Sequence, residues 1–208
     1  MKETLRTMGS QESKRVLITG FGPYCGLEHN PSWEGVNRLN NEEIESKYNI
    51  HLFKEQIDVG YQCVDMSVPK LWRKLQPDLT IHVGVSDKTT CFLLETKACK
   101  VGYELSDITG ACPVDYKHWS NGPQAITTDL DIEALCQEFN SNPPAEGLEA
   151  KKSEDAGRYL CEYTYYTSLS CGGTSKTLFV HVPLYGYTFK DIALGVERIL
   201  DISLRQIR

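Results

Sequence analysis

Two side chains in the C-terminal part of the chain, Cys161 and His181, have the types and spacing of a nucleophile and its base. Cys161 follows Ser153, Asp155 and a glycine, and we interpret this polar stretch as the start of a helix, with Ser153 and Asp155 as capping residues. A thiol there meets unpaired N–H groups and the positive end of the helix dipole, which favour the thiolate. His181 lies in the apolar run 178–183, which is typical of a buried strand. Such a pair can attack a carbonyl group.

Taken alone, this pair is more often a packed thiol and a core histidine, so that alternative stays open. A possible third member is Glu95, which closes the apolar run 91–95. A glutamate in that position is usually a solvated strand end, but a buried acid would orient an imidazole well.

The elements that would position these residues alternate between strand and helix patterns. We expect strands at 15–20, 50–57, 79–85, 91–95, 147–152 and 178–183, and helices at 30–40, 61–75, 131–140, from 153 through Cys161, and 189–204. This alternation predicts an α/β protein: a single-domain α/β/α sandwich with a mostly parallel, twisted sheet and helices on both faces. Residues 100–121 lack periodicity and predict a long excursion, either a lid or a hairpin.

The loop at 20–26 follows the first strand and offers two aromatic residues, Phe21 and Tyr24. Ligands of open α/β sheets bind at the carboxyl ends of the strands, so this loop is either an aromatic ligand platform or an ordinary strand-to-helix turn. Its glycines resemble a nucleotide-binding turn only weakly, because Pro23 interrupts the pattern.

Composition narrows the class of protein. The chain has 208 residues, 40% of them hydrophobic and 24% charged, as expected for a soluble domain with a sizeable core. The net charge of −6 gives no support for nucleic-acid binding, and no apolar run approaches the length of a membrane span. Residues 1–14 are polar, without the apolar segment of a signal peptide. We therefore expect a disordered extension at 1–14 and one catalytic domain at 15–208.

The eight cysteines are scattered, with no CxxC pair and no Cys/His spacing of a zinc site. We expect buried free thiols in a reducing compartment rather than a disulfide framework, and no metal or other cofactor.

Several motifs together resemble the pyroglutamyl-peptidase I family of cysteine omega-peptidases. They are VLITGFGPY (16–24), NPSW (30–33), HVGVS (82–86), DAGRYLC (155–161), YTYYTSL (163–169) and FVHVP (179–183). The similarity extends from Arg15 to about Arg205. It implies a cytosolic enzyme, monomeric or homo-oligomeric, that removes N-terminal pyroglutamate from small peptides, without nucleic-acid or membrane partners.

The resemblance also implies roles for individual residues. The family's nucleophile falls on Cys161, its histidine on His181 and its glutamate on Glu95. Residues that cradle the oxoproline ring fall on Phe21, Tyr24 and Tyr159, and the asparagine of the first helix falls on Asn30.

The chain departs from the family pattern near the acid. Leu93 stands where the family usually has Ser or Thr, Thr96 replaces a basic residue, and Lys100 replaces an asparagine. The second loop aromatic is Tyr24 rather than Phe, and Asp58-Val59 replaces Pro-Val. Two alternatives therefore stay open: a catalytically weak paralogue that binds pyroglutamyl peptides, and a different cysteine amidase on the same scaffold.

Overall fold

The computed structural model describes residues 13–24, 26–172 and 176–207. The first strand begins at Lys14, so the expected disordered extension falls almost entirely outside the described residues.

A six-stranded sheet forms the centre of the described chain, in the order β2-β1-β3-β8-β4-β7. All neighbouring strands are parallel except β4 and β8, which are antiparallel. The strands are β1 (Lys14–Phe21), β2 (Ile50–Ile57), β3 (Leu79–Ser86), β4 (Phe92–Glu95), β7 (Ala150–Ser153) and β8 (Lys176–Pro183). The expected mostly parallel sheet is confirmed, with β4 and β7 running opposite to the other four strands.

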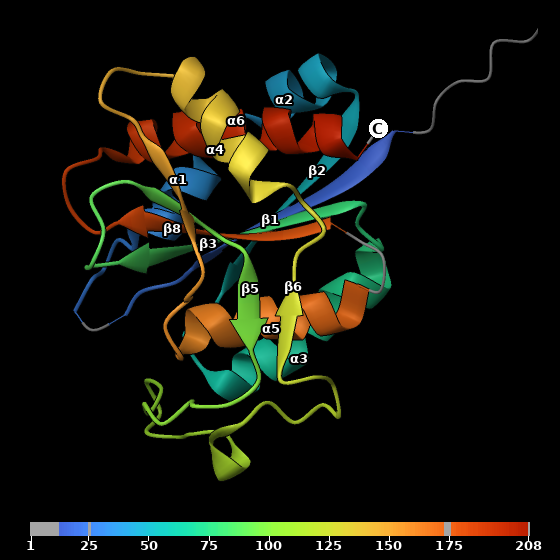
Figure 1. Ribbon diagram of the computed structural model, residues 1–208, viewed down its shortest axis with the longest axis vertical. Coiled ribbons are helices and arrows are strands. Elements are labelled where there is room, and N and C mark those ends of the chain that lie inside the picture. Colours follow the sequence, from blue (N-terminus) through green and yellow to red (C-terminus); the bar gives the residue numbers. More distant parts are fainter. Residues whose placement is uncertain (1–12, 25, 173–175, 208) are drawn as a thin grey trace, which may run out of the picture.

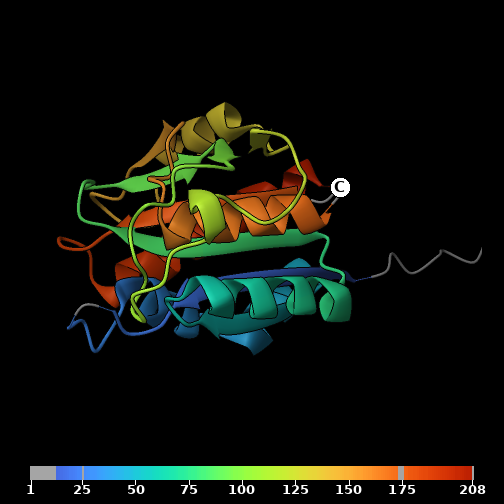
Figure 2. The same ribbon diagram turned by 90° about the horizontal axis from the view of Figure 1, so that it is seen from below.

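Helices cover both faces of this sheet (Figure 1). On one face lie α1 (Pro31–Asn37), α2 (Asn41–Tyr48), α4 (Ile132–Ser141) and α6 (Phe189–Gln206). On the other face lie α3 (Tyr61–Leu75) and α5 (Leu160–Gly172), side by side in both views (Figure 2). The expected α/β/α layering is therefore confirmed.

Each face of the sheet has its own hydrophobic core. The core under α1, α4 and α6 is mainly aliphatic, with side chains such as Ile81 and Val196 fully buried. The core under α3 and α5 is mainly aromatic and includes Phe179 and Tyr163. Burial of each such side chain contributes about 1.5–3 kcal/mol, so the two cores fix the helices firmly against the sheet.

The excursion (residues 100–121) joins the two strands of a small antiparallel sheet, β5 (Lys97–Cys99) and β6 (Ala125–Thr127), and contains a short 3-10 turn at Val114–Tyr116. Of the two expected forms, a lid or a hairpin, the structure has the hairpin. The inner side of the excursion is anchored to the aromatic layer: Tyr103 is fully buried, and the buried His118 shares a hydrogen bond of 3.0 Å with Thr167 of α5. Trp119 donates to Asp65 of α3 at 2.8 Å.

The excursion exposes apolar side chains on its outer side, among them Leu105, Ile108 and Val114. Backbone hydrogen bonds from Gly102 and Tyr103 to the carbonyl of Tyr116 close its base. It is thus fixed on one side and solvated on the other.

One helix was missed and one local expectation was wrong. Helix α2 was not foreseen, because Ile44 is its only buried residue and the helix therefore shows no apolar periodicity. Ser153 and Asp155 do not cap the helix of Cys161: Ser153 ends β7, and α5 begins at Leu160. The side chain of Asp155 instead accepts the Gly157 N–H at 3.1 Å, in the loop that leads to the helix.

Candidate active site

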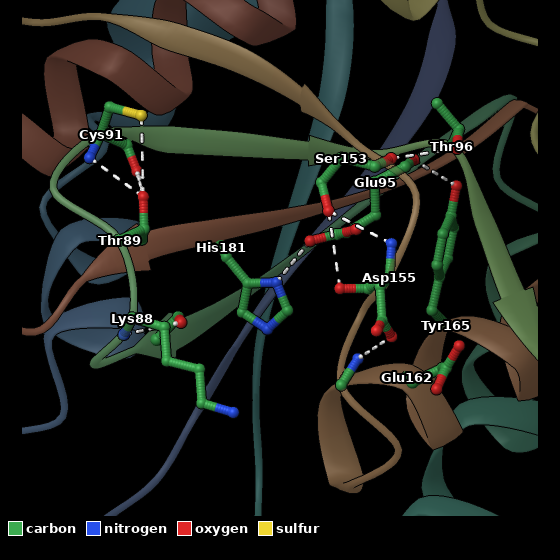
Figure 3. Close-up of polar contacts among 12 residues, drawn as sticks. Lys88, Thr89, Cys91, Glu95, Thr96, Ser153, Asp155, Glu162, Tyr165 and His181 are labelled. Atoms are coloured by element: carbon green, nitrogen blue, oxygen red, sulfur yellow. Dashed lines mark hydrogen bonds and ion pairs between the residues drawn. The ribbon is translucent and has the colours of Figure 1, made fainter.

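His181 and Glu95 form a buried hydrogen-bonded pair between two neighbouring strands. His181 lies on β8 opposite Leu93, and Glu95 ends β4 two residues further on. The imidazole Nδ1 lies 2.8 Å from Glu95 Oε1, and the side chains are 8% and 0% exposed (Figure 3). The reversed direction of β4 brings its last residue beside β8, so the acid is not the solvated strand end that such a residue usually is.

Cys161 is the second residue of α5, and its sulfur faces the sheet at β3. A Cβ added to Gly84 would lie 2.8 Å from Cys161 Sγ and 2.7 Å from Phe179 Cζ. In the parallel pairing of β3 and β8, Gly84 is the partner of His181. A glycine is needed here because the sulfur occupies the space of a side chain beside the imidazole.

Because Gly84 is the β3 partner of His181, Cys161 Sγ lies close to the imidazole of His181. Burial acts to lower the pKa of His181. The Cys161 thiolate and the hydrogen bonds to Cys161 and Glu95 outweigh burial and raise this pKa from 6.5 to about 10. Since Glu95 occupies Nδ1, the remaining ring nitrogen, Nε2, is the one available to the sulfur. The three side chains thus lie in the order Cys161, His181, Glu95.

The backbone before α5 turns sharply to present this thiol. Gly157 and Arg158 both have positive φ, 96° and 55°. Nothing within 4 Å would meet a Cβ at Gly157, so the conformation itself requires the glycine. The amides of Leu160 and Cys161 lie in the first turn of the helix, where N–H groups have no carbonyl partner within the helix. Such N–H groups can stabilise an oxyanion formed at the sulfur.

The aromatic residues expected to hold a ring belong to the same aromatic layer as this thiol. Phe21, Tyr24, Tyr159 and Cys161 all belong to the aromatic core or pack against it. The rings of Tyr24 and Tyr159 lie 6.0 Å apart, and the Tyr159 hydroxyl donates to the Ser106 carbonyl of the excursion at 3.2 Å.

Asn30 lies behind the loop at 20–26. Its side chain accepts from the Ser32 N–H at 3.1 Å as the N-cap of α1, and its amide donates to the Gly22 carbonyl at 2.9 Å. Asn30 thereby holds Gly22, which directly follows Phe21 in the chain.

Sequence reasoning missed three residues of this region. Gly84 interrupts an apolar strand, which is a recognisable signal of close approach. Tyr61, at the start of α3, packs edge-on against Tyr159 with ring centroids 6.1 Å apart. Glu162 looked like an ordinary helical acid, but it is fully buried. Neither Tyr61 nor Glu162 stands out by type or spacing.

Within the described ranges, no group of three or more His, Cys, Asp or Glu side chains is arranged to hold a metal ion. The seven cysteines of the described part are all free thiols. In the same part of the chain, every helix is too short or too polar to cross a membrane.

Comparison with known proteins identifies related sequences over most of the chain. A family model described as pyroglutamyl peptidase matches residues 14–198. Pyroglutamyl-peptidase 1 of Rattus norvegicus is 37% identical over 187 residues, covering 89% of this chain and 86% of that protein. The human pyroglutamyl-peptidase 1 is 36% identical and covers 92% of both chains.

A solved structure shows the same fold. The crystal structure of Bacillus amyloliquefaciens pyroglutamyl peptidase I superposes with a TM-score of 0.77 at 27% identity. The superposition covers 90% of this chain and 95% of that one.

Proposed function

The chain belongs to the pyroglutamyl peptidase family, and we propose that it hydrolyses the amide bond after an N-terminal pyroglutamyl residue, with Cys161, His181 and Glu95 as its catalytic residues. The observation that carries the assignment of residues is the buried hydrogen bond between His181 and Glu95, with Cys161 Sγ beside Gly84, the β3 partner of His181. This is the arrangement that nucleophilic attack on an amide requires.

In the proposed first step, the Cys161 thiolate attacks the pyroglutamyl carbonyl carbon. The carbonyl oxygen becomes an oxyanion, stabilised by first-turn amides of α5. The imidazolium of His181 then gives its proton to the departing amine nitrogen as the C–N bond breaks, which leaves a thioester on Cys161.

In the second step, neutral His181 removes a proton from water, and the resulting hydroxide attacks the thioester. Pyroglutamate leaves, and the thiolate and imidazolium are restored. Glu95 holds the Nδ1–H throughout, so Nε2 faces the reacting atoms and the imidazolium is stabilised each time it forms.

We further propose that the pyroglutamyl ring binds between Phe21, Tyr24 and Tyr159. The ring is small and uncharged, so aromatic walls suit it, whereas the charges of a free N-terminal glutamate would be desolvated there without compensation. Asn30 contributes indirectly, by holding Gly22, which directly follows Phe21.

The proposal on partners follows from this site. We expect small peptides that begin with pyroglutamate as substrates, acted on by the protein as a monomer or homo-oligomer. Free thiols throughout the described chain are compatible with the reducing cytosol as its compartment.

The test compares fluorogenic amides of pyroglutamate, proline and glutamate, with Cys161→Ala as the control for contaminating activity. We expect cleavage of the pyroglutamyl reporter alone and none by the variant. Faster cleavage of the prolyl or glutamyl reporter would contradict the proposed substrate, and activity retained in Cys161→Ala would contradict the proposed nucleophile.

A further inference from the structure

Glu162 is a buried carboxylate beside the nucleophile, and the mechanism above does not use it. It directly follows Cys161 in α5, and its side chain is 1% exposed. Removing a carboxylate from water costs several kcal/mol unless cations and hydrogen bonds compensate. The partners of Glu162 therefore indicate what it does.

The first set of partners belongs to the turn before the helix. Glu162 Oε2 accepts the backbone N–H of Arg158 at 2.9 Å, and the Arg158 guanidinium Nη1 lies 2.6 Å from Oε2 and 2.8 Å from Oε1. Arg158 has the left-handed backbone conformation that an L-residue adopts at a cost. Glu162 thus stabilises the strained turn from which Cys161 and its first-turn amides project.

The second partner lies on the segment that carries the triad acid. Glu162 Oε1 accepts the backbone N–H of Cys99 at 2.9 Å. Cys99 is four residues beyond Glu95, and its carbonyl accepts a hydrogen bond from the buried Tyr103 hydroxyl, so it is held from both sides.

One helical turn further along α5, Tyr165 makes a parallel connection. Its hydroxyl donates to the backbone carbonyl of Glu95 at 2.9 Å (Figure 3). The helix of the nucleophile is therefore joined to the segment 95–99 at two points, Glu162 to Cys99 and Tyr165 to Glu95.

We propose that Glu162 is a positioning residue which, together with Tyr165, fixes Cys161 beside the His181–Glu95 pair. Glu162 touches neither substrate nor reacting atoms. It acts through the turn at Arg158 and through Cys99, and its catalytic consequence rests on the proposed function. A shift of the sulfur by about 1 Å would be enough to lower the rate about a hundredfold.

The test uses Glu162→Gln, which keeps the shape of the side chain but loses the charge and turns an amide NH2 toward donors. Tyr165→Phe removes only the second connection. Glu149→Gln is the matched control, because Glu149 is a half-exposed acid whose carboxylate pairs with Lys151 at 3.1 Å, on the outer edge of the sheet. For each variant we would measure kcat and KM on the pyroglutamyl reporter, the melting temperature, and the pH dependence of Cys161 alkylation by mass spectrometry of its peptide.

We expect Glu162→Gln to lower kcat at least about tenfold, with KM changed less than about threefold. The pH at half-maximal alkylation of Cys161 should move up, because a displaced sulfur lies farther from the imidazolium of His181. Tyr165→Phe should shift both quantities in the same direction by less, and Glu149→Gln should shift neither. Glu162→Asp, which keeps the charge, should recover part of kcat.

Two results would overturn the inference. One is a kcat within about twofold of the parent enzyme with an unmoved alkylation midpoint. The other is a lower melting temperature with an unchanged midpoint, which would show a role in stability alone. If Glu162→Gln does not fold, Tyr165→Phe decides by the same measurements. If the parent protein does not cleave the reporter, the proposed function fails, and the alkylation profiles still decide whether Glu162 positions Cys161.

Discussion

Replacing Glu95 with Gln isolates the contribution of the carboxylate charge to the site. The substitution keeps the size of the side chain at a position with no exposure, so packing is preserved. It converts a charge-assisted hydrogen bond of 2.8 Å to His181 Nδ1 into a neutral one. Hydrogen bonds to charged groups contribute about 1.5–3 kcal/mol and neutral ones about 0.5–1.5 kcal/mol, so the substitution removes about 1–1.5 kcal/mol. At about 1.4 kcal/mol per factor of ten, kcat/KM at pH 7 should fall about 5- to 12-fold.

The pH profile should change in a defined direction. In the parent enzyme, the imidazolium of His181 persists below its pKa of about 10 and is lost above it. Glu95 is one of the groups that raise this pKa, so Glu95→Gln should move the alkaline limb of kcat/KM to lower pH while the Cys161 contribution remains.

The assay is kcat/KM for the pyroglutamyl reporter from pH 6 to 11, with circular dichroism at each pH to confirm folding. Cys161→Ala and His181→Ala serve as references and should lose more activity than Glu95→Gln. An alkaline limb that stays in place, with kcat/KM within about twofold of the parent, would refute Glu95 as the group that stabilises the imidazolium.

Three further changes test other parts of the site. Cys161→Ala should lower kcat about a thousandfold or more while the melting temperature stays within a few degrees; substantial residual turnover would place the nucleophile elsewhere. Iodoacetamide should inactivate the enzyme, and pyroglutamate should protect it. Incubation with EDTA should leave activity unchanged. A loss of activity with EDTA that a divalent cation restores would contradict a metal-free mechanism. Gly84→Ala would place a Cβ 2.8 Å from Cys161 Sγ, so the sulfur must move. We expect kcat to fall at least about tenfold and the free energy of unfolding to fall by about 1–3 kcal/mol. Kinetics like those of the parent would show that the sulfur is not held against β3.

Sequence patterns predicted those strands and helices whose apolar residues recur at the spacing of the side chains that are buried. The strand at 50–57 and the helix at 61–75 have the bounds of β2 and α3, because their residue types and apolar spacing match their surroundings. The layers followed from the alternation of strands and helices. Helix α2 escaped prediction because an exposed helix with one buried side chain is stabilised by capping at Asn40 rather than by an apolar face.

The site was predictable only where residue type limits the chemistry. A cysteine near a helix start and a histidine in a strand suggested a nucleophile and a base. Glu95 was a candidate acid from its place at the end of an apolar run, and the family resemblance implied its role in the triad. The burial of Glu95 depends on β4 running against β8, a pairing between residues 86 positions apart that no local pattern encodes. Glu162 escaped for the same reason, since its partner Cys99 lies 63 residues earlier.

The inner and outer parts of the excursion (residues 100–121) should differ in how easily their backbone opens to solvent. The amides of Gly102, Tyr103 and His118 are hydrogen-bonded on the side held by the aromatic layer, so their hydrogens should exchange with solvent only when the α3–α5 layer opens. The outer part around Val114, which is 82% exposed, has no such layer above it and is the natural point for a protease to cut. After cleavage there, the two new chain ends would remain attached to the protein through β5 and β6. The segment 95–99, which joins Glu95 to α5, would stay in place.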